Sequence, residues 1–429
     1  MMWTNIPLEY ATERFISGGT PSTSNPSFWG GEIPWITGAD FNDDGVSLGR
    51  RFISKDALIN TATNLVPKGS VLLVTRTGVG KIAIATQDTA ISQDITGIIQ
   101  KSGFDAQFIL YAIRSSNGNL ISAQRGATIK GVTRDVVKKL PIPFIAISEQ
   151  RRIVEILDEA DRLRRLRHEA DAKATRILPA LFLKMFGDPA TNPKGWAEKP
   201  LREAIAIVDA GWSATNEARL RQKHEFGVLK VSAVTSGRFL AEEHKAVIDI
   251  PETRTLVRPR RGDLLFSRAN TRELVAASCI VDADHPNLFL SDKLWRLTPR
   301  DGIASTLFLK ELFWNDGIRD RFRVASSGSS GSMLNISQEA MLRTVVPMPP
   351  YELQMKFEAI AWRLIEITNQ ARNTASKIDS IWETLMQRAF SGQLTAKWRE
   401  AHSKELLAGM EQQARLLNLP LPKEMELAP

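Results

Sequence analysis

KGSVLLVTR at residues 68–76 returns as RGDLLFSR at residues 261–268. Each stretch has a basic residue, a glycine, a short polar residue, an apolar run and a closing arginine. Other motifs recur in the same order: SQD at 92–94 and SDK at 291–293, FIL at 108–110 and FLK at 308–310, LPIP at 140–143 and VPMP at 346–349, then Gln150 and Gln354. Because the order is kept throughout, the repeats indicate an internal duplication, which constrains the architecture more than any single motif.

Short apolar runs flanked by glycine, proline, serine and aspartate open each half of the chain, at residues 34–37 and 71–75 and again at 228–231 and 264–267. Such runs are typical of β-strands. After its Pro-x-Pro motif, each half continues as a long helical pattern with apolar residues at heptad positions a and d. Eight side chains represent this predicted seam: Ile153, Ile156, Leu163, Ile177, Phe357, Ile360, Leu364 and Ile378.

The two predicted helices are expected to pack against each other, because each has an apolar stripe that must be covered. If they pack antiparallel, the second helix carries the chain back to the first half. The sequence therefore predicts an α/β fold in which two mixed α/β domains are separated by a long antiparallel two-helix coiled coil with pseudo-two-fold symmetry. The predicted boundaries are 1–147 and 191–350 for the two domains, 148–190 and 351–400 for the helical spacers, and 401–429 for a tail in which 404–417 can form a helix.

The composition excludes several classes of protein. Hydrophobic residues make up 43% and charged residues 24%, as in folded globular proteins. No stretch approaches the ~18 apolar residues of a membrane helix, and the start lacks a basic and then apolar signal region. One cysteine, Cys279, permits no internal disulfide, and the five histidines lack metal-ligand spacing. We expect a cytoplasmic protein without a metal site or catalytic residues.

The charge and the duplication together favour DNA as the partner. The chain has 56 Lys and Arg against 48 Asp and Glu, a net charge of +8, and two related basic domains at a fixed spacing suit duplex DNA. Because the repeated loops differ in sequence, the two half-sites should differ, which predicts an asymmetric, interrupted target.

Candidate DNA contacts are hydroxyl, amide, guanidinium and ammonium side chains on glycine-rich loops, since these groups bind phosphates and base edges. A solvated surface position is the alternative for each of them. In the first domain they are Ser22, Thr23, Arg76, Thr77, Lys81, Gln93, Arg125 and Lys130. In the second they are Lys230, Ser232, Arg268, Asn270, Arg272, Lys293 and Ser329.

The chain resembles the specificity (S) subunit of Type I restriction-modification enzymes over roughly residues 1–400. The resemblance is carried by the motifs SGGTPS at 17–22, IPWITG at 33–38, KGVT at 130–133, EQRRIV at 149–154, GDLLFSR at 262–268 and AFSGQLT at 389–395, together with LPIP and VPMP. The family implies two target-recognition domains for a bipartite DNA sequence. It also implies two helical regions that dock two methyltransferase (M) subunits and fix the spacing between half-sites.

The same resemblance implies that the chemistry resides in partner subunits. The M subunits bring S-adenosylmethionine and methylate adenine N6, and restriction (R) subunits add ATP-driven translocation and cleavage. This chain has no N/D-P-P-Y/F motif of adenine methyltransferases, and the resemblance implies no cofactor bound by the chain itself.

Three other interpretations remain to be weighed. ILDEAD at residues 156–161 resembles the acidic motif of nucleotide-hydrolysing helicases, but it lies within the heptad pattern and no phosphate-binding loop accompanies it. A free-standing bipartite DNA-binding protein would bind DNA tightly without a methyltransferase. A coiled-coil adaptor would not bind DNA at all.

Overall fold

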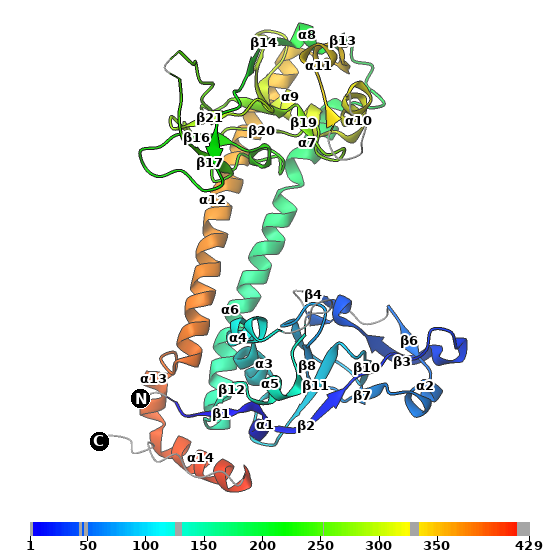
Figure 1. Cartoon of the computed structure of the whole chain (residues 1–429), viewed down its shortest axis with the longest axis vertical. Coiled ribbons are helices and arrows are strands. Elements are labelled where there is room, and N and C mark those ends of the chain that lie inside the picture. The colour runs from blue at the N-terminus through cyan, green and yellow to red at the C-terminus, as the bar shows by residue number, and fades with distance from the viewer. Residues whose placement is uncertain are drawn as a thin grey trace. The chain divides into compact units, whose positions relative to one another are not determined.

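The computed structural model describes residues 3–42, 45–46, 50–124, 131–251, 253–326 and 334–417. The chain divides into two compact units: unit 1 comprises residues 1–167 and 375–429, and unit 2 comprises residues 168–374. Each unit contains β-sheets with helices packed on them (Figure 1), which confirms the mixed α/β prediction. The boundaries between the units fall inside long helices, and the five-part division predicted from the sequence stays a prediction.

Unit 1 is built around two four-stranded sheets. The first is antiparallel, in the order β2 (Thr12–Ser17), β11 (Ile95–Gln100), β8 (Val71–Val74) and β9 (Ile82–Ile84). The second has the order β6 (Phe52–Ile53), β3 (Trp29–Ile36), β10 (Thr89–Ile91) and β7 (Asn64–Val66), with β3 and β10 parallel. Two-stranded ribbons pair β1 (Asn5–Pro7) with β12 (Pro141–Pro143) and β4 (Phe41–Asn42) with β5 (Gly45–Val46).

Unit 2 repeats this plan. Its antiparallel sheet has the order β14 (Ile205–Ala210), β22 (Leu294–Pro299), β18 (Leu264–Ser267) and β20 (Ser278–Ile280). The second sheet has the order β15 (Asn216–Glu217), β17 (His244–Val247), β16 (Gly227–Leu229) and β21 (Leu288–Leu290), and it too has one parallel pair, β16 and β21, which lies at the end of this sheet rather than at its centre. The ribbons are β13 (Glu198–Pro200) with β24 (Val345–Pro347) and β19 (Ala269–Asn270) with β23 (Leu334–Asn335).

Helices cover these sheets and link them. Unit 1 contains α1 (Leu8–Ala11), α2 (Lys55–Asn60), α3 (Ala106–Ser115), α4 (Asn117–Ser122), α5 (Arg134–Lys138), α13 (Ala396–Ala401) and α14 (Ser403–Leu417). Unit 2 contains α7 (Ile177–Phe186), α8 (Leu201–Ala204), α9 (Thr306–Trp314), α10 (Asp316–Ala325) and α11 (Gln338–Arg343). The long helices α6 (Ile147–Ala174) and α12 (Tyr351–Phe390) contribute to both units. None of the described helices combines the length and apolar character that a bilayer span requires.

The repeated apolar runs form the central strands β8 and β18. Val71 and Leu73 pack in one hydrophobic cluster with α3, whereas Leu72 and Val74 face a second cluster on the other side of the sheet. Because β8 is covered on both faces, its sequence is continuously apolar rather than alternating.

The two glutamines of the repeat hold the same position in each unit. Gln150 is fully buried; its Oε1 accepts a hydrogen bond from the Asp105 amide at 2.9 Å, and its Nε2 donates to the carbonyls of Gly103 and Ile145. Gln354 binds the Ser305 amide, also at 2.9 Å, and two carbonyls in the same way. Asp105 and Ser305 cap α3 and α9. Each glutamine therefore joins the start of a long helix to the cap of a domain helix.

The long helices pack side by side within each unit. In unit 1, Glu149 near the start of α6 binds Thr395, whereas Arg164 farther along α6 lies 5.2 Å from the Trp382 ring of α12. The helices therefore run antiparallel there. In unit 2, Phe182 and Phe186 of α7 pack against Phe357 of α12, with ring centroids 5.7 and 5.4 Å apart.

The packed face of the helices differs from the predicted heptad register. Ile153 and Phe357 are buried and Ile156, Leu364 and Ile378 are half-buried, but Leu163, Ile177 and Ile360 are 50%, 49% and 44% exposed. Three buried residues of α12, Ala361, Ala375 and Trp382, are not among the predicted seam residues, and Ala361 directly follows the exposed Ile360.

Two structural features explain this correction. Thr175 and Arg176 form a turn that separates α6 from α7, so one register cannot continue from residue 153 to residue 177. In addition, a charged residue, Asp161, occupies a buried position on α6, where Arg164 and Arg165 neutralise it.

The ILDEAD motif lies within α6, as the heptad pattern predicts. The Asp161–Arg165 and Glu159–Arg162 ion pairs also form as the helical spacing predicts. Asp158 does not bind Arg162; it accepts a hydrogen bond from the Tyr111 hydroxyl at 2.7 Å. This contact and burial raise the pKa of Tyr111.

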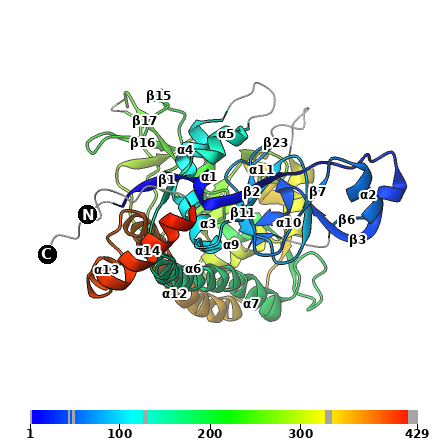
Figure 2. The same ribbon diagram turned by 90° about the horizontal axis from the view of Figure 1, so that it is seen from below.

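The tail forms the predicted helix, α14, and completes the core of unit 1. Leu406, Met410 and Ala414 join the same hydrophobic cluster as α3, and Gln413 donates a hydrogen bond to the Gly103 carbonyl at 2.9 Å. In both views α14 lies beside the start of α6 (Figures 1 and 2). The AFSGQLT motif leads into this tail, and its Thr395 is anchored on buried Glu149 together with Arg399.

Candidate nucleic-acid interface

Four loops of unit 1 meet at one edge of its sheets. They follow β2, β3, β8 and β10, and backbone hydrogen bonds join them: Gly19 N to Ile91 O, Ser92 N to Ile36 O, and Thr75 N to Asp94 O, at 2.7 to 2.9 Å. A Cβ at Gly18 would collide with the carbonyl oxygens of Ile91 and Ser92. The glycine of the SGGTPS motif is therefore needed for this close approach.

Four predicted contact residues of unit 1 lie on the joined loops. Arg76, Thr77, Lys81 and Gln93 are all exposed. The Lys81 ammonium donates to the Gly38 carbonyl at 3.2 Å, which ties the loop after β8 to the loop after β3. Gln93 contacts Thr20 of the loop after β2. One guanidinium and one ammonium group, with a neighbouring hydroxyl and a neighbouring amide group, can bind a phosphate backbone and base edges.

The other predicted residues of the first domain are placed differently. Ser22 and Thr23 are exposed farther along the loop after β2, where the Ser22 carbonyl accepts a hydrogen bond from the Trp29 indole at 3.1 Å. Arg125 and Lys130 lie outside the described residues.

Unit 2 builds the same edge. Trp212 N binds Leu290 O at 2.9 Å, and Arg268 N binds Lys293 O at 3.0 Å. A Cβ at Gly211 would collide with the carbonyls of Leu290 and Ser291, just as at Gly18 in unit 1. Gly211 is thus the counterpart of Gly18, a correspondence that the sequence repeat did not reveal because the flanking residues differ.

The two arginines paired by the sequence repeat are not structural equivalents. The Thr75 amide donates to the Asp94 carbonyl, and the Thr75 carbonyl accepts from the Val132 amide. In the same way, the Arg268 amide donates to the Lys293 carbonyl, and the Arg268 carbonyl accepts from the Ile336 amide. Arg268 therefore occupies the place of Thr75, and Arg76 that of Ala269. The reason is that KGSVLLVTR is one residue longer than RGDLLFSR between its glycine and its arginine.

This shift by one residue places the two arginines on opposite sides, because side chains alternate along an extended strand. Arg76 is exposed, whereas Arg268 is half-buried, with its guanidinium 5.8 Å from the Trp295 ring centroid and no partner for Nε among the described residues. The Arg268 side chain therefore packs against Trp295 of the sheet, while its backbone belongs to the joined loops of unit 2.

The remaining predicted residues of unit 2 differ in how free their side chains are. Glu243 binds both the Lys230 ammonium at 2.7 Å and the Ser232 hydroxyl at 2.5 Å, and the pKa of Glu243 is lowered chiefly by Lys230. The charge of Lys230 is thus already balanced. Arg272 is exposed, and Asn270 Oδ1 accepts from the Thr271 amide at 2.8 Å. Lys293 is half-buried beside Arg268, and Ser329 lies outside the described residues.

One further basic residue belongs to the edge of unit 2. Arg254 lies 5.3 Å from the ring centroid of Trp212, the residue after Gly211, and is exposed. The aromatic face orients the guanidinium without neutralising it. In the sequence, Arg254 belonged to an arginine-rich stretch typical of a charged surface loop, and only the packing on Trp212 distinguishes it.

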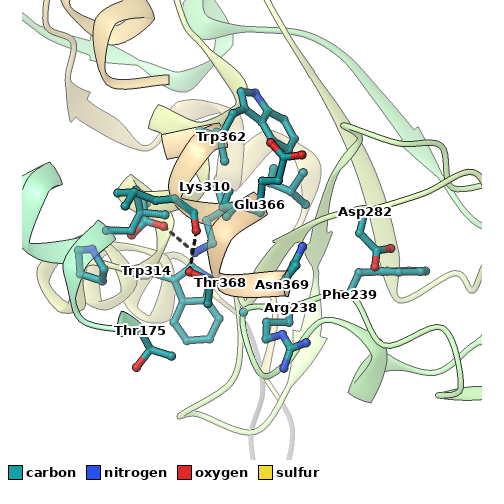
Figure 3. A pocket seen from close by; sticks show the side chains of 18 of the residues that line it. Thr175, Arg238, Phe239, Asp282, Lys310, Trp314, Trp362, Glu366, Thr368 and Asn369 are labelled. Carbon is teal, nitrogen blue, oxygen red and sulfur yellow. Dashed lines mark hydrogen bonds and ion pairs between the residues drawn. The ribbon is translucent and has the colours of Figure 1, made fainter. Parts of the chain in front are cut away.

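A cavity of about 840 Å³ lies elsewhere in unit 2, between α7, α9, α12 and the segment 236–239. Figure 3 shows Lys310, Trp314, Trp362 and Arg238 around it. Its described lining includes four basic and four acidic side chains, so it lacks the positive excess that a phosphate site needs. The loop edges are therefore the better candidate for nucleic acid.

Comparison with known proteins bears on these edges. A model of the Type I restriction modification DNA specificity domain matches residues 13–175. The chain is 28% identical over 240 residues to the MjaIX specificity subunit of Methanocaldococcus jannaschii, covering 51% of this chain and 55% of the relative. It is 25% identical over 339 residues to the EcoKI specificity subunit of Escherichia coli K12, covering 74% of this chain and 70% of the relative. Its matches to the EcoEI and EcoR124I specificity subunits cover 34% and 39% of those proteins.

Two solved structures share the fold. One is the S subunit of a Type I restriction-modification system from M. genitalium, with a TM-score of 0.55 over 90% of this chain and 96% of that chain, at 15% identity. The other comes from a study of complex assembly and conformational transition of the Type I system, with a TM-score of 0.52 over 92% and 98%, at 16% identity. Residues 13–175 thus match the Type I restriction modification DNA specificity domain, and about three quarters of the chain is similar to the EcoKI specificity subunit.

Proposed function

We propose that this chain is the DNA-recognition subunit of a Type I restriction-modification system. The observation that carries the proposal is the repeated loop edge: both units present exposed basic side chains and an amide side chain on loops that follow equivalent strands. Arginine and lysine there neutralise phosphates, while arginine, asparagine and glutamine bond base edges. Because Arg76, Lys81 and Gln93 correspond to no identical set in unit 2, the two half-sites differ and the target is asymmetric and bipartite.

In this proposal α6, α7 and α12 form the antiparallel coiled coil that relates the units by a pseudo-two-fold axis and fixes the spacer between the half-sites. Support comes from the antiparallel packing of α6 on α12 in unit 1 and from the packing of α7 on α12 in unit 2. The same helices dock two M subunits and, in a restriction-competent complex, R subunits. Insertion of one heptad into both long helices should lengthen the preferred spacer and leave the half-sites unchanged.

The chain is non-catalytic in this proposal. Adenine-N6 methylation takes place in the M subunits, which supply S-adenosylmethionine, and this chain selects which adenines reach them. A cytoplasmic location follows, since the genome is the target.

Reconstitution tests the proposal. The purified chain is mixed with an M subunit and S-adenosylmethionine, and methylated adenines are mapped on a plasmid of diverse sequence. Methylation confined to one asymmetric, interrupted sequence is expected, and a specific affinity that falls steeply with salt. Tight specific binding by the chain alone, unchanged by the M subunit, would favour a free-standing DNA binder; no duplex binding at any salt concentration would favour an adaptor.

A further inference from the structure

The loop of unit 2 that carries Asn270 and Arg272, residues 268–277, contains an unfavourable backbone conformation. Ala276 has a φ of +64°, which is the left-handed region, and it is fully buried. A residue with a Cβ rarely adopts this conformation, and such residues persist where surrounding contacts hold them. Backbone hydrogen bonds close the loop, from Ala276 N to Ser267 O at 3.0 Å and from Ser267 N to Ala277 O at 2.8 Å, and further support comes from outside the loop.

Helix α10 supplies that support through two arginines. The Arg319 guanidinium donates hydrogen bonds to the carbonyls of Glu273, three residues before Ala276, and Val275, immediately before it. Arg323 Nε donates to the Arg272 carbonyl at 2.9 Å, while its Nη1 pairs with Asp320 at 2.6 Å. All three bonds to the loop end on backbone carbonyls, so they fix the path of its backbone and leave the Arg272 side chain exposed.

The two arginines are themselves held in place. Arg319 is 6% exposed, and its guanidinium lies 4.9 Å from the ring centroid of Trp314. Trp314 in turn donates to the Ser278 carbonyl at 2.8 Å, at the end of the loop. Loop 268–277 is thus joined to α10 at Arg272, Glu273 and Val275, and β20, which follows the loop, is joined to α9 at Ser278.

We propose that α10 braces loop 268–277 and that Arg319 and Arg323 are positioning residues for the DNA specificity of unit 2. The inference rests on the proposed function. Base-edge recognition requires donors placed to within about 0.5 Å, so a loop that relaxes around Ala276 loses discrimination even though every base-contacting side chain remains. Neither arginine contacts DNA in this proposal.

The main test uses Arg323→Met, with Arg321→Met as the matched control. Arg321 lies on the same helix and donates to the carbonyls of Val345 and Ala190, not to the loop. In the reconstituted methyltransferase complex, the ratio of methylation on the specific duplex to that on duplexes altered in one half-site is measured. Arg323→Met should lower this ratio about tenfold at the half-site that Arg272→Ala also affects, and it should leave the ratio at the other half-site unchanged. Arg321→Met should change the ratio less than about twofold at both half-sites.

A second measurement follows the loop directly in the full chain. Hydrogen exchange at the amides of residues 270–277 should accelerate in Arg323→Met and in the milder Arg319→Lys, and not in Arg321→Met. Adding Ala276→Gly to Arg323→Met should restore part of the lost discrimination, because glycine adopts a positive φ without the brace.

Unchanged exchange in both variants, or equal loss at both half-sites, would overturn the brace. Failure of the proposed function looks different: the wild-type complex would then discriminate at neither half-site, while the exchange experiment would still decide whether α10 holds the loop.

Discussion

The two loops that follow the central strands, 75–81 in unit 1 and 268–277 in unit 2, are closed by the same backbone hydrogen bonds but differ in the contacts around them. In unit 1, Gly80 N binds Val74 O and Val74 N binds Lys81 O at 2.8 Å; in unit 2, Ala276 N binds Ser267 O and Ser267 N binds Ala277 O, also at 2.8 Å. Loop 75–81 has glycine at the left-handed position 80, whereas loop 268–277 has alanine at the equivalent position 276, and arginines of α10 bind its backbone.

The frames beneath these loops are nearly identical. Gln150 and Gln354 make the same three hydrogen bonds, and Gly18 and Gly211 allow the same close approach. The comparison indicates that the duplicated frame and the loops with the candidate DNA contacts are supported by separate contacts. A loop can therefore change length and side chains while the frame remains intact.

The largest effect on stability is expected from removing the equivalent glutamine hydrogen bonds of the two units. Gln150→Leu and Gln354→Leu each leave a buried amide and two carbonyls without this partner, which should lower the free energy of unfolding of the affected unit by about 3 kcal/mol. Denaturant unfolding measures this. Gln413→Leu is the control and should cost less than about 1 kcal/mol, since the Gly103 carbonyl retains Gln150. A large loss in only one unit would show that the glutamines are not equivalent.

The next effect separates the two arginines that differ in register. Arg268→Ala should lower stability by about 1 kcal/mol, because the guanidinium packs over Trp295, and should lower discrimination at one half-site by about 1 to 3 kcal/mol. Arg76→Ala should affect the other half-site alone and leave unfolding unchanged. Thermal unfolding measures the loss of stability, and binding to duplexes altered in one half-site measures the loss of discrimination. Equal stability losses would contradict the register shift.

Reciprocal substitutions at the left-handed positions sharpen the contrast between the loops. Gly80→Ala places a Cβ at a φ of +95° and against the Asn117 side chain, so it should cost about 1 to 2 kcal/mol. Ala276→Gly relieves a positive φ and should change stability in the opposite direction by about 0.5 kcal/mol, since glycine also adds freedom to the unfolded chain. Urea unfolding measures the change in the free energy of unfolding in both variants. A change of the same sign in both variants would contradict the predicted contrast between the two loops.

The smallest effect concerns the balanced charge at Lys230. Lys230→Ala should raise the pKa of Glu243 toward its ordinary value, followed by NMR titration of the carboxyl group. A carboxylate whose pKa is lowered in the folded state stabilises the fold above its unfolded pKa of about 4.5 and loses that contribution as the pH falls through the folded pKa. The variant should therefore lose less stability on acidification. Lys245→Ala, on the paired strand, is the control and should leave the Glu243 titration unchanged.

Much of the frame could be predicted from residues close together in the sequence. The repeated GSVLLV and GDLLFS runs became equivalent strands, and the positions of Gln150 and Gln354 after the Pro-x-Pro motifs matched in three dimensions. The tail helix was also predictable, because residues 404–417 contain a continuous helical pattern. The DNA-contact residues themselves stay predictions.

The errors arose where a turn, a buried charge or a long-range contact outweighs the repeating pattern of the sequence. Heptad periodicity predicted Leu163 and Ile360 at the seam, but a turn at Thr175–Arg176 and the buried, ion-paired Asp161 reset the packed face. The sequence repeat paired Arg76 with Arg268, but the hydrogen bonds to Asp94 and Lys293 pair Thr75 with Arg268.

The amino-acid sequence alone was enough to establish the duplication, the mixed α/β class and the family resemblance, because strands, helices and motifs leave periodic or ordered traces in neighbouring residues. The direction in which each basic side chain points, the carbonyls that Arg319 and Arg323 bind, and the attachment of α14 to unit 1 depend on residues far apart in the chain. A displacement of one residue along a strand turns a side chain to the opposite face, and only the assembled sheet determines that displacement.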